Sequence, residues 1–239
     1  MSQLEENLVN VRSSITEAAQ KSGRRPDDVR LVAVSKTMGA EKVAEVLRSG
    51  QTLFGENKVQ EAREKIPLVG GDAEWHMIGR LQKNKAKYIP GLFTTVHSVD
   101  SFELAEALNL AMANALERGK GLKSEILHIL IQVNIAMEES KGGATETELI
   151  NLIKKISILS HLKIKGLMII PPYSENTEET RAYFKKLRQL RDKIAVMKLP
   201  NVDMEELSMG MSHDFEVAIE EGATLVRVGS AIFGERNTA

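Results

Sequence analysis

Cysteine is absent from this chain of 239 residues. Without cysteine the protein forms no disulfide, no thiolate metal site and no thiol nucleophile. Long apolar runs are missing as well, and a stretch such as 129–131 is far too short to cross a bilayer. The start of the chain carries Glu5 and Glu6, where a secretory signal would place Lys or Arg before an apolar run. These absences predict a cytoplasmic protein that makes no use of a membrane.

The chain has no excess of charge of one sign, because 32 Lys and Arg residues face 33 Asp and Glu residues. Binding to a nucleic-acid backbone requires a clustered cationic surface, so no nucleic-acid partner is expected. The sequence also lacks a G-x-x-x-x-G-K-[ST] loop and a G-x-G-x-x-G fingerprint, and its five histidines show no metal-ligand spacing. No metal site is therefore expected, whereas a local site for a small phosphorylated ligand is compatible with the composition.

Short apolar runs alternate with helical stripes along the chain. The first 22 residues predict a helix with a capping box formed by Ser2 and Glu5. Eight predicted strands follow, separated by helical stripes, at 31–35, 52–54, 74–78, 92–97, 126–133, 164–170, 206–208 and 225–228. This alternation, in a chain close to the usual barrel length of about 250 residues, predicts a single (β/α)8 TIM barrel over residues 1–239 with an extra N-terminal helix. Two domains would also fit the length, but no linker or change of composition divides the chain.

The ends of the predicted strands supply the candidate site, because ligands of such barrels bind at the carboxyl ends of the strands. Lys36 ends the first strand, and a lysine amine whose pKa is lowered by burial or a nearby cation can condense with an aldehyde. The alternative for Lys36 is an ordinary solvated surface lysine. The other polar or sulfur-bearing residues at strand ends are Asn57, His76, Asn134, Met168, Ser208 and Arg227.

A glycine-serine turn follows the last predicted strand. Gly229 and Ser230 begin a short helix-like stretch, where backbone N–H groups and the helix dipole favour a phosphate group. Ser208, at the end of the neighbouring strand, is expected to add its hydroxyl to the same phosphate. A simple turn that needs glycine is the alternative explanation for Gly229. Ser212 is predicted to cap the helix that ends at Gly222.

At these residues the sequence resembles the pyridoxal-phosphate homeostasis protein family, also known as proline synthetase co-transcribed homologues. The matching segments follow one another along nearly the whole chain. They are 32–37 (VAVSKT), 54–57 (FGEN), 75–85 (WHMIGRLQKNK), 166–168 (GLM), 207–212 (LSMGMS) and 226–234 (VRVGSAIFG). Each segment alone is weak evidence, but their order and spacing are highly specific.

The resemblance implies a barrel similar to the N-terminal domain of alanine racemase, with pyridoxal 5′-phosphate (PLP) held covalently. By motif, Lys36 forms the Schiff base, and Arg227 faces the pyridine nitrogen. The phosphate is implied to bind Ser208, Gly229 and Ser230, and the ring is implied to contact Asn57, His76 and Met168. Two departures from the family pattern are slight: Ser230 replaces a frequent threonine, and His213 stands where an acidic residue is more usual.

The expected function is intracellular PLP homeostasis, in which the protein stores, shields or delivers the cofactor and has no catalytic residue. Arg227 cannot readily protonate the pyridine nitrogen, which makes the cofactor a weaker electron sink. The chain ends five residues after Gly234, so we expect no following domain to supply the opposing tyrosine of alanine racemase, and Tyr173 is the tyrosine expected near the mouth. The alternatives are an amino-acid racemase and, at lower rank, a Schiff-base aldolase. We expect a monomer that makes transient contacts with PLP-dependent apo-enzymes.

Overall fold

Eight parallel strands form a closed barrel in the computed structural model, which describes residues 1–119, 122, 124–137 and 142–234. Strands that are adjacent in sequence pair with one another, and β1 pairs with β8 to close the ring. The strands are β1 (Arg30–Val34), β2 (Leu53–Glu56), β3 (Glu74–Met77), β4 (Thr95–Val99), β5 (Leu127–Gln132), β6 (Leu162–Met168), β7 (Val202–Met211) and β8 (Leu225–Val228). The predicted (β/α)8 barrel is confirmed.

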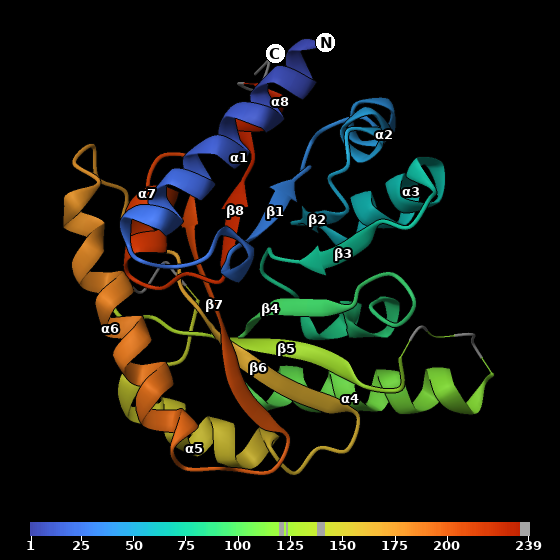
Figure 1. The fold of residues 1–239 in the computed structure, drawn as a ribbon. Helices are drawn as coiled ribbons and strands as arrows, with labels where there is room; N and C mark the ends of the chain where they lie inside the picture. The colour runs from blue at the N-terminus through green and yellow to red at the C-terminus, as the bar shows by residue number, and fades with distance from the viewer. Residues whose placement is uncertain (120–121, 123, 138–141, 235–239) are drawn as a thin grey trace.

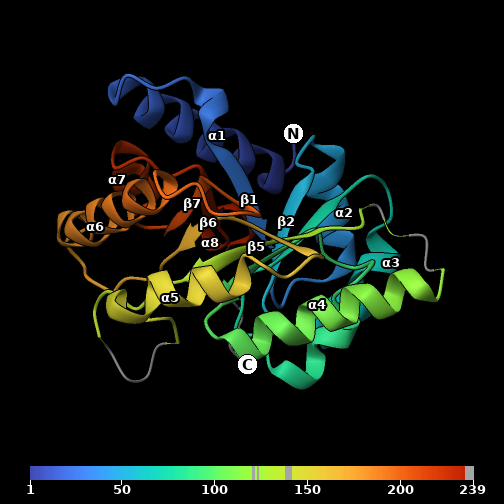
Figure 2. The ribbon, with the colours of Figure 1, turned by 90° about the horizontal axis from the view of Figure 1, so that it is seen from below.

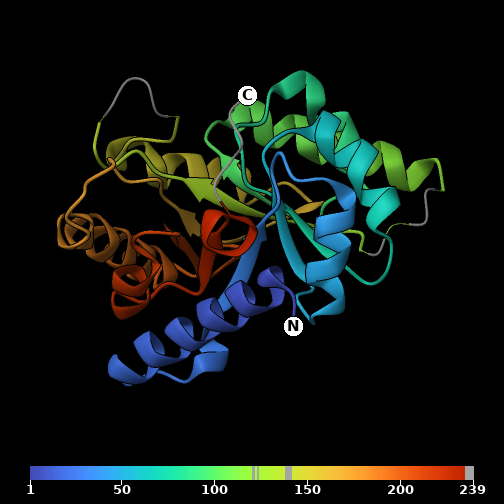
Figure 3. The same ribbon diagram turned by 90° about the horizontal axis from the view of Figure 1, so that it is seen from above.

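Helices surround the barrel, because parallel neighbours must be joined by crossover connections (Figures 1, 2 and 3). The connections contain α2 (Ala40–Arg48), α3 (Val59–Val69), the 3₁₀ helix η2 (Lys83–Tyr88), α4 (Phe102–Glu117), α5 (Glu146–Ile156), α6 (Glu178–Ala195) and α7 (Phe215–Glu220), and α8 (Ser230–Phe233) follows β8. The extra helix α1 (Gln3–Lys21) has the predicted capping box of Ser2 and Glu5 and packs against α7 and α8. A short 3₁₀ helix, η1 (Pro26–Asp28), leads into β1. None of the described helices has the length and apolar character needed to cross a membrane.

The largest difference from the predicted elements is the length of β7. The sequence predicts a strand at 206–208, whereas β7 extends from Val202 to Met211. Its first half alternates buried Met204 with exposed or half-buried polar residues, and Met204 has a left-handed φ of 51°, so the apolar pattern is interrupted. As a result, Ser208 lies within the strand, three residues before its end, and the mouth of the barrel is formed by later residues.

The barrel interior is packed with side chains. One buried apolar cluster joins residues of five strands and the residue after β3, and such a set can meet only inside the ring. It consists of Val32, Val34, Leu53, Ile78, Leu130, Met168 and Leu225. Four polar side chains, His76, His97, Ser208 and Arg227, are also buried, with no side chain among them more than 5% exposed. Burial of this kind is stable when the polar groups are hydrogen-bonded to one another.

Candidate cofactor site

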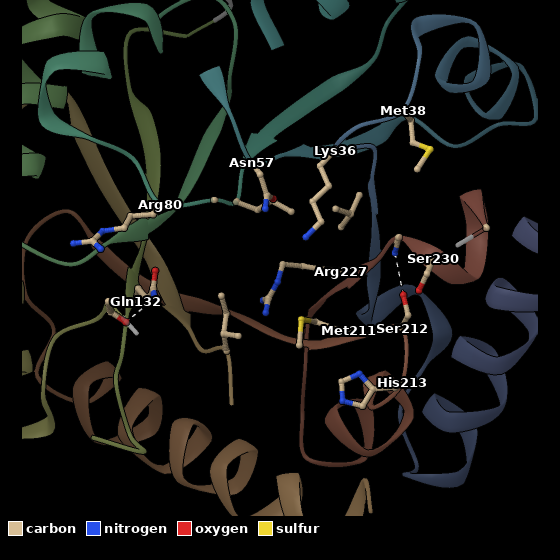
Figure 4. Close-up of a pocket in the computed structure, with 17 residues that line it drawn as sticks. Lys36, Met38, Asn57, Arg80, Gln132, Met211, Ser212, His213, Arg227 and Ser230 are labelled. Atoms are coloured by element: carbon tan, nitrogen blue, oxygen red, sulfur yellow. Dashed lines mark hydrogen bonds between the residues drawn. The ribbon is translucent and has the colours of Figure 1, made fainter. Parts of the chain in front are cut away.

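A cavity of about 390 Å³ opens at the carboxyl ends of the strands. Five of the eight residues predicted for the site line it: Lys36, Asn57, Arg227, Gly229 and Ser230. Figure 4 shows the Lys36 amine and the Arg227 guanidinium pointing into the same space, with Asn57 beside them. The volume falls in the range of small-molecule sites. Sequence reasoning and barrel geometry therefore lead to the same end of the molecule.

The turn that carries Lys36 is held by hydrogen bonds to Glu61 and Lys65 of α3. Thr37, the next residue, has a left-handed φ of 68°, which is uncommon for a residue other than glycine. Its backbone N–H donates to Glu61 Oε1 at 2.5 Å. Lys65 Nζ donates to the Ser35 carbonyl at 2.7 Å and to Glu61 Oε1 at 2.7 Å. The residues on both sides of Lys36 are thus fixed from the same helix, which sets the direction of its side chain.

A buried ion pair lies directly behind this turn. Lys65 Nζ lies 2.6 Å from Glu56 Oε1, and the Ser35 hydroxyl donates to the same oxygen at 2.7 Å. The Glu56 side chain is fully buried, and its Oε2 has no hydrogen-bond partner among the described residues. Burial raises the pKa of Glu56, while the hydrogen bond from Lys65 opposes that shift. Nothing in the sequence predicts this pair beyond two charged residues nine positions apart.

Arg227 is buried and firmly held in the barrel. One terminal nitrogen of its guanidinium donates to Ser208 Oγ at 2.6 Å, and the other donates to the Ile169 carbonyl at 2.8 Å. Burial lowers the pKa of Arg227 to about 10, so the group stays cationic at neutral pH. A charged donor in a fixed orientation therefore faces the cavity.

The turn after β8 contains the second set of polar groups. The Gly229 N–H donates to Ser212 Oγ at 3.1 Å, and α8 begins at Ser230. The first N–H groups of a helix have no partner within it and favour an anion. Ser212 does not cap α7 as predicted, because Asp214 is the N-cap residue and the Ser212 hydroxyl belongs to this turn. Ser212 and Ser230 both line the cavity.

Cations dominate the charge of the cavity. Lys36, Arg80 and Arg227 line it, and no aspartate or glutamate is among the described residues that do. An anionic ligand is the natural complement of such a lining. The polar or sulfur-bearing lining residues that are absent from the predicted site are Met38, Arg80, Gln132, Met211, Ser212 and His213. Met211 could have been found from a correct end of β7, and Arg80 lies in the matching segment 75–85, whereas Gln132 carries no signal in the pattern.

The other three predicted residues do not line the cavity. Ser208 lies beneath Arg227, where its hydroxyl also lies 2.9 Å from His97 Nδ1. His76 Nδ1 lies 2.8 Å from His97 Nε2, so His76 is deeper still. Met168 is fully buried in the apolar cluster of the barrel interior. The Ser208 hydroxyl therefore contacts the Arg227 guanidinium, and its expected contact with the phosphate stays a prediction.

Comparison with known proteins decides the family. A family described as "Alanine racemase, N-terminal domain" matches residues 7–237. A protein of Aquifex aeolicus (strain VF5) named "Pyridoxal phosphate homeostasis protein" is 43% identical over 233 residues, which cover 97% of each chain. A protein of Escherichia coli (strain K12) with the same name is 39% identical over 99% of this chain and 98% of its own. The chain belongs to the pyridoxal phosphate homeostasis protein family. The resemblance inferred from the motifs is confirmed.

Solved structures agree with this membership. PipY of Synechococcus elongatus PCC7942, in a structure with PLP bound, has a TM-score of 0.82 and 35% identity, covering 97% of this chain and all of that one. Alanine racemase from Corynebacterium glutamicum has a TM-score of 0.66 and 18% identity, covering 95% of this chain and 61% of that one. The second likeness shows a shared fold alone. This member of the homeostasis protein family therefore has the same barrel as the racemase domain.

Proposed function

We propose that this chain binds PLP in the cavity at the carboxyl ends of the strands, with Lys36 in a Schiff base. The observation that carries the proposal is the donor set of the cavity. It combines an amine, a buried guanidinium and a glycine-serine turn at a helix start, without a lining carboxylate among the described residues. An amine suits an aldehyde, and a turn of this kind suits a phosphate ester. The names of the relatives and the PLP-bound PipY structure support the same ligand.

Each group of the cavity then has a distinct task. The Lys36 amine would add to the aldehyde carbon, and the carbonyl oxygen would leave as water with the two protons of the amine. Gly229 and Ser230, with Ser212, would hold the phosphate. Arg227 would direct an N–H toward the pyridine nitrogen and Asn57 would contact the ring. PLP supplies a conjugated aldehyde that amines can capture reversibly.

The biological role that fits this site is PLP homeostasis, in which the protein stores or shields the cofactor and delivers it to apo-enzymes. A reversible bond to one lysine holds the aldehyde away from other amines and can release it to an acceptor.

One observation favours a second candidate, an amino-acid racemase. Tyr173 packs on His213 with ring centroids 5.2 Å apart, and His213 lines the cavity, so a second proton carrier has a place at the mouth.

A spectral titration tests the proposed ligand and its attachment. Apo-protein titrated with PLP should develop a visible absorption band in the wild type, and Lys36→Ala should abolish it. Lys83→Ala, at an exposed lysine outside the cavity, is the matched control and should behave as the wild type. An unchanged band in Lys36→Ala would refute attachment at Lys36.

Two further assays separate the candidate functions. A carrier should restore the activity of a PLP-dependent apo-enzyme when the loaded protein is added, without racemising single-enantiomer amino acids. Rapid and saturable racemisation that disappears in Lys36→Ala would favour the racemase and would overturn the carrier role.

A further inference from the structure

A hydrogen-bonded row of side chains leads from the cavity to the opposite end of the barrel. Arg227 contacts Ser208 Oγ at 2.6 Å, and Ser208 Oγ lies 2.9 Å from His97 Nδ1. His97 Nε2 lies 2.8 Å from His76 Nδ1, and His76 Nε2 lies 3.0 Å from Glu74 Oε1. Glu74 is the first residue of β3, at the N-terminal end of the barrel. These five residues come from four strands and form one continuous row.

The two ends of the row determine the direction of every hydrogen bond in it. A guanidinium can only donate, so Ser208 Oγ accepts from Arg227 and its single proton is available for His97 Nδ1. An ionised carboxylate can only accept, so His76 must carry a proton on Nε2. Both histidines are then Nε2–H tautomers, and His97 Nε2–H donates to His76 Nδ1. The reverse direction would leave the unprotonated His76 Nε2 facing the Glu74 carboxylate, with two acceptors 3.0 Å apart.

The electrostatic surroundings agree with neutral histidines and an ionised glutamate. Burial lowers the pKa of His76 and of His97, and the charges of Arg227 and Arg30 lower that of His97 further. The hydrogen bond from His76 lowers the pKa of Glu74 to about 2. Two other groups face this end of the row: the Thr94 hydroxyl donates to Glu74 Oε1 at 3.0 Å, and Arg30 NH1 lies 3.9 Å from Glu74 Oε2.

We propose that Glu74, His76 and His97 are positioning residues, which fix the Ser208 hydroxyl and thereby the Arg227 guanidinium from inside the barrel. Each group in the row has a single arrangement of protons that satisfies its neighbours, so Ser208 always presents its lone pairs to Arg227. The guanidinium is thus held in one orientation before any ligand enters. Its effect on PLP rests on the function proposed above, whereas the arrangement of protons does not.

Nitrogen NMR of the histidine rings in the apo-protein tests the row without a ligand. The wild type should show His76 and His97 protonated on Nε2 and unprotonated on Nδ1 at neutral pH. Glu74→Leu removes the terminal acceptor and should shift both histidine patterns away from that tautomer. Glu206→Gln is the matched control, because Glu206 lies at the same end and binds Arg30 without touching the row. Protonation of either histidine on Nδ1 in the wild type, or unchanged patterns in Glu74→Leu, would overturn the proposal.

A second measurement tests the consequence for the cofactor. Ser208→Ala and His97→Phe break the row next to Arg227 and should weaken PLP binding by about tenfold, the size of one lost hydrogen bond to a charged group. They should also shift the absorption maximum of the loaded protein, whereas Glu206→Gln should do neither. If both variants bind PLP with unchanged affinity and spectrum, the positioning role is refuted. Failure of the wild type to bind PLP would refute the proposed function and leave the NMR result to decide the row.

Discussion

Charged side chains at the N-terminal end of the barrel pair with one another, whereas those at the C-terminal end surround a cavity. Arg30 contacts Glu74 and Glu206, and Lys163 contacts Asp203 at 3.0 Å. At the other end, charges of one sign gather around the space that Lys36 enters. Pairs of exposed charges contribute little to stability. An excess of cations around a cavity is a cost in the free protein that an anionic ligand offsets.

The C-terminal end also contains a pair that is unlike those at the N-terminal end, because it is buried. Lys65→Met would leave the buried Glu56 carboxylate without its cation, and we expect a loss of about 3–5 kcal/mol in the free energy of unfolding. Lys165→Met removes a partly exposed lysine paired with Asp203 and Glu205, and the expected loss is about 1 kcal/mol or less. Urea denaturation of the two variants measures the difference.

Equal losses of stability in the two lysine variants would contradict the distinction between the buried ion pair of Lys65 and the partly exposed ion pairs of Lys165. The double variant Lys65→Met with Glu56→Leu removes both charges and should recover much of the loss, since apolar side chains can replace a buried ion pair. If the double variant is as unstable as the single one, the contacts of Lys65 with Ser35 and Glu61 are the dominant contribution.

Alanine substitutions at two glycines compare the packing near the end of β7 with the packing after α1. Gly210 lies near the end of β7 with a φ of 89°, and a Cβ there would lie 2.6 Å from the Cβ of Ala218. Gly23, after α1, has a φ of 71° but no atom within 4 Å of the added carbon. We expect Gly210→Ala to cost about 3 kcal/mol, from strain and overpacking, and Gly23→Ala about 1 kcal/mol, from strain alone. Equal losses of stability in the two variants, measured by thermal denaturation, would show that the contact of a side chain at position 210 with α7 is unimportant.

The smallest effect on stability is expected at Glu74, which lies at the N-terminal end of the barrel and is the last residue of the hydrogen-bonded row. Its pKa in the folded protein, about 2, lies below the ordinary value of 4.5, so its contribution is complete above pH 4.5 and is lost as the pH falls toward 2. Because 40% of the side chain is exposed, the contribution is discounted to about 1 kcal/mol. The stability of the wild type should therefore fall more steeply between pH 4.5 and 2 than that of Glu74→Gln. Parallel curves of unfolding free energy against pH for the two proteins would contradict the lowered pKa of Glu74.

The sequence predicts the parts of this molecule that depend on periodicity and local chemistry. Alternating strands and stripes predict the barrel, and the position of Lys36 after an apolar strand predicts the direction of its amine. Gly229 and Ser230 are likewise found by their turn. These features depend on a few neighbouring residues, so a single sequence is enough to recognise them.

The buried polar contacts could not be predicted in this way. The predicted strand 206–208 places Ser208 at the mouth, whereas β7 continues to Met211. Its neighbour His97 comes from another strand far away in sequence. The local pattern predicts Ser212 as a helix cap, and only the register of β7 and β8 brings it to Gly229. Such contacts depend on how strands are staggered around the ring, which no local pattern contains.

Borohydride reduction of the PLP-loaded protein, followed by peptide mapping, tests the central claim most directly. Reduction converts the Schiff base into a stable amine, so the pyridoxyl group should be found on Lys36 and on no other lysine. A pyridoxyl group on a different lysine, or no modification after incubation with excess PLP, would contradict the assignment of this cavity.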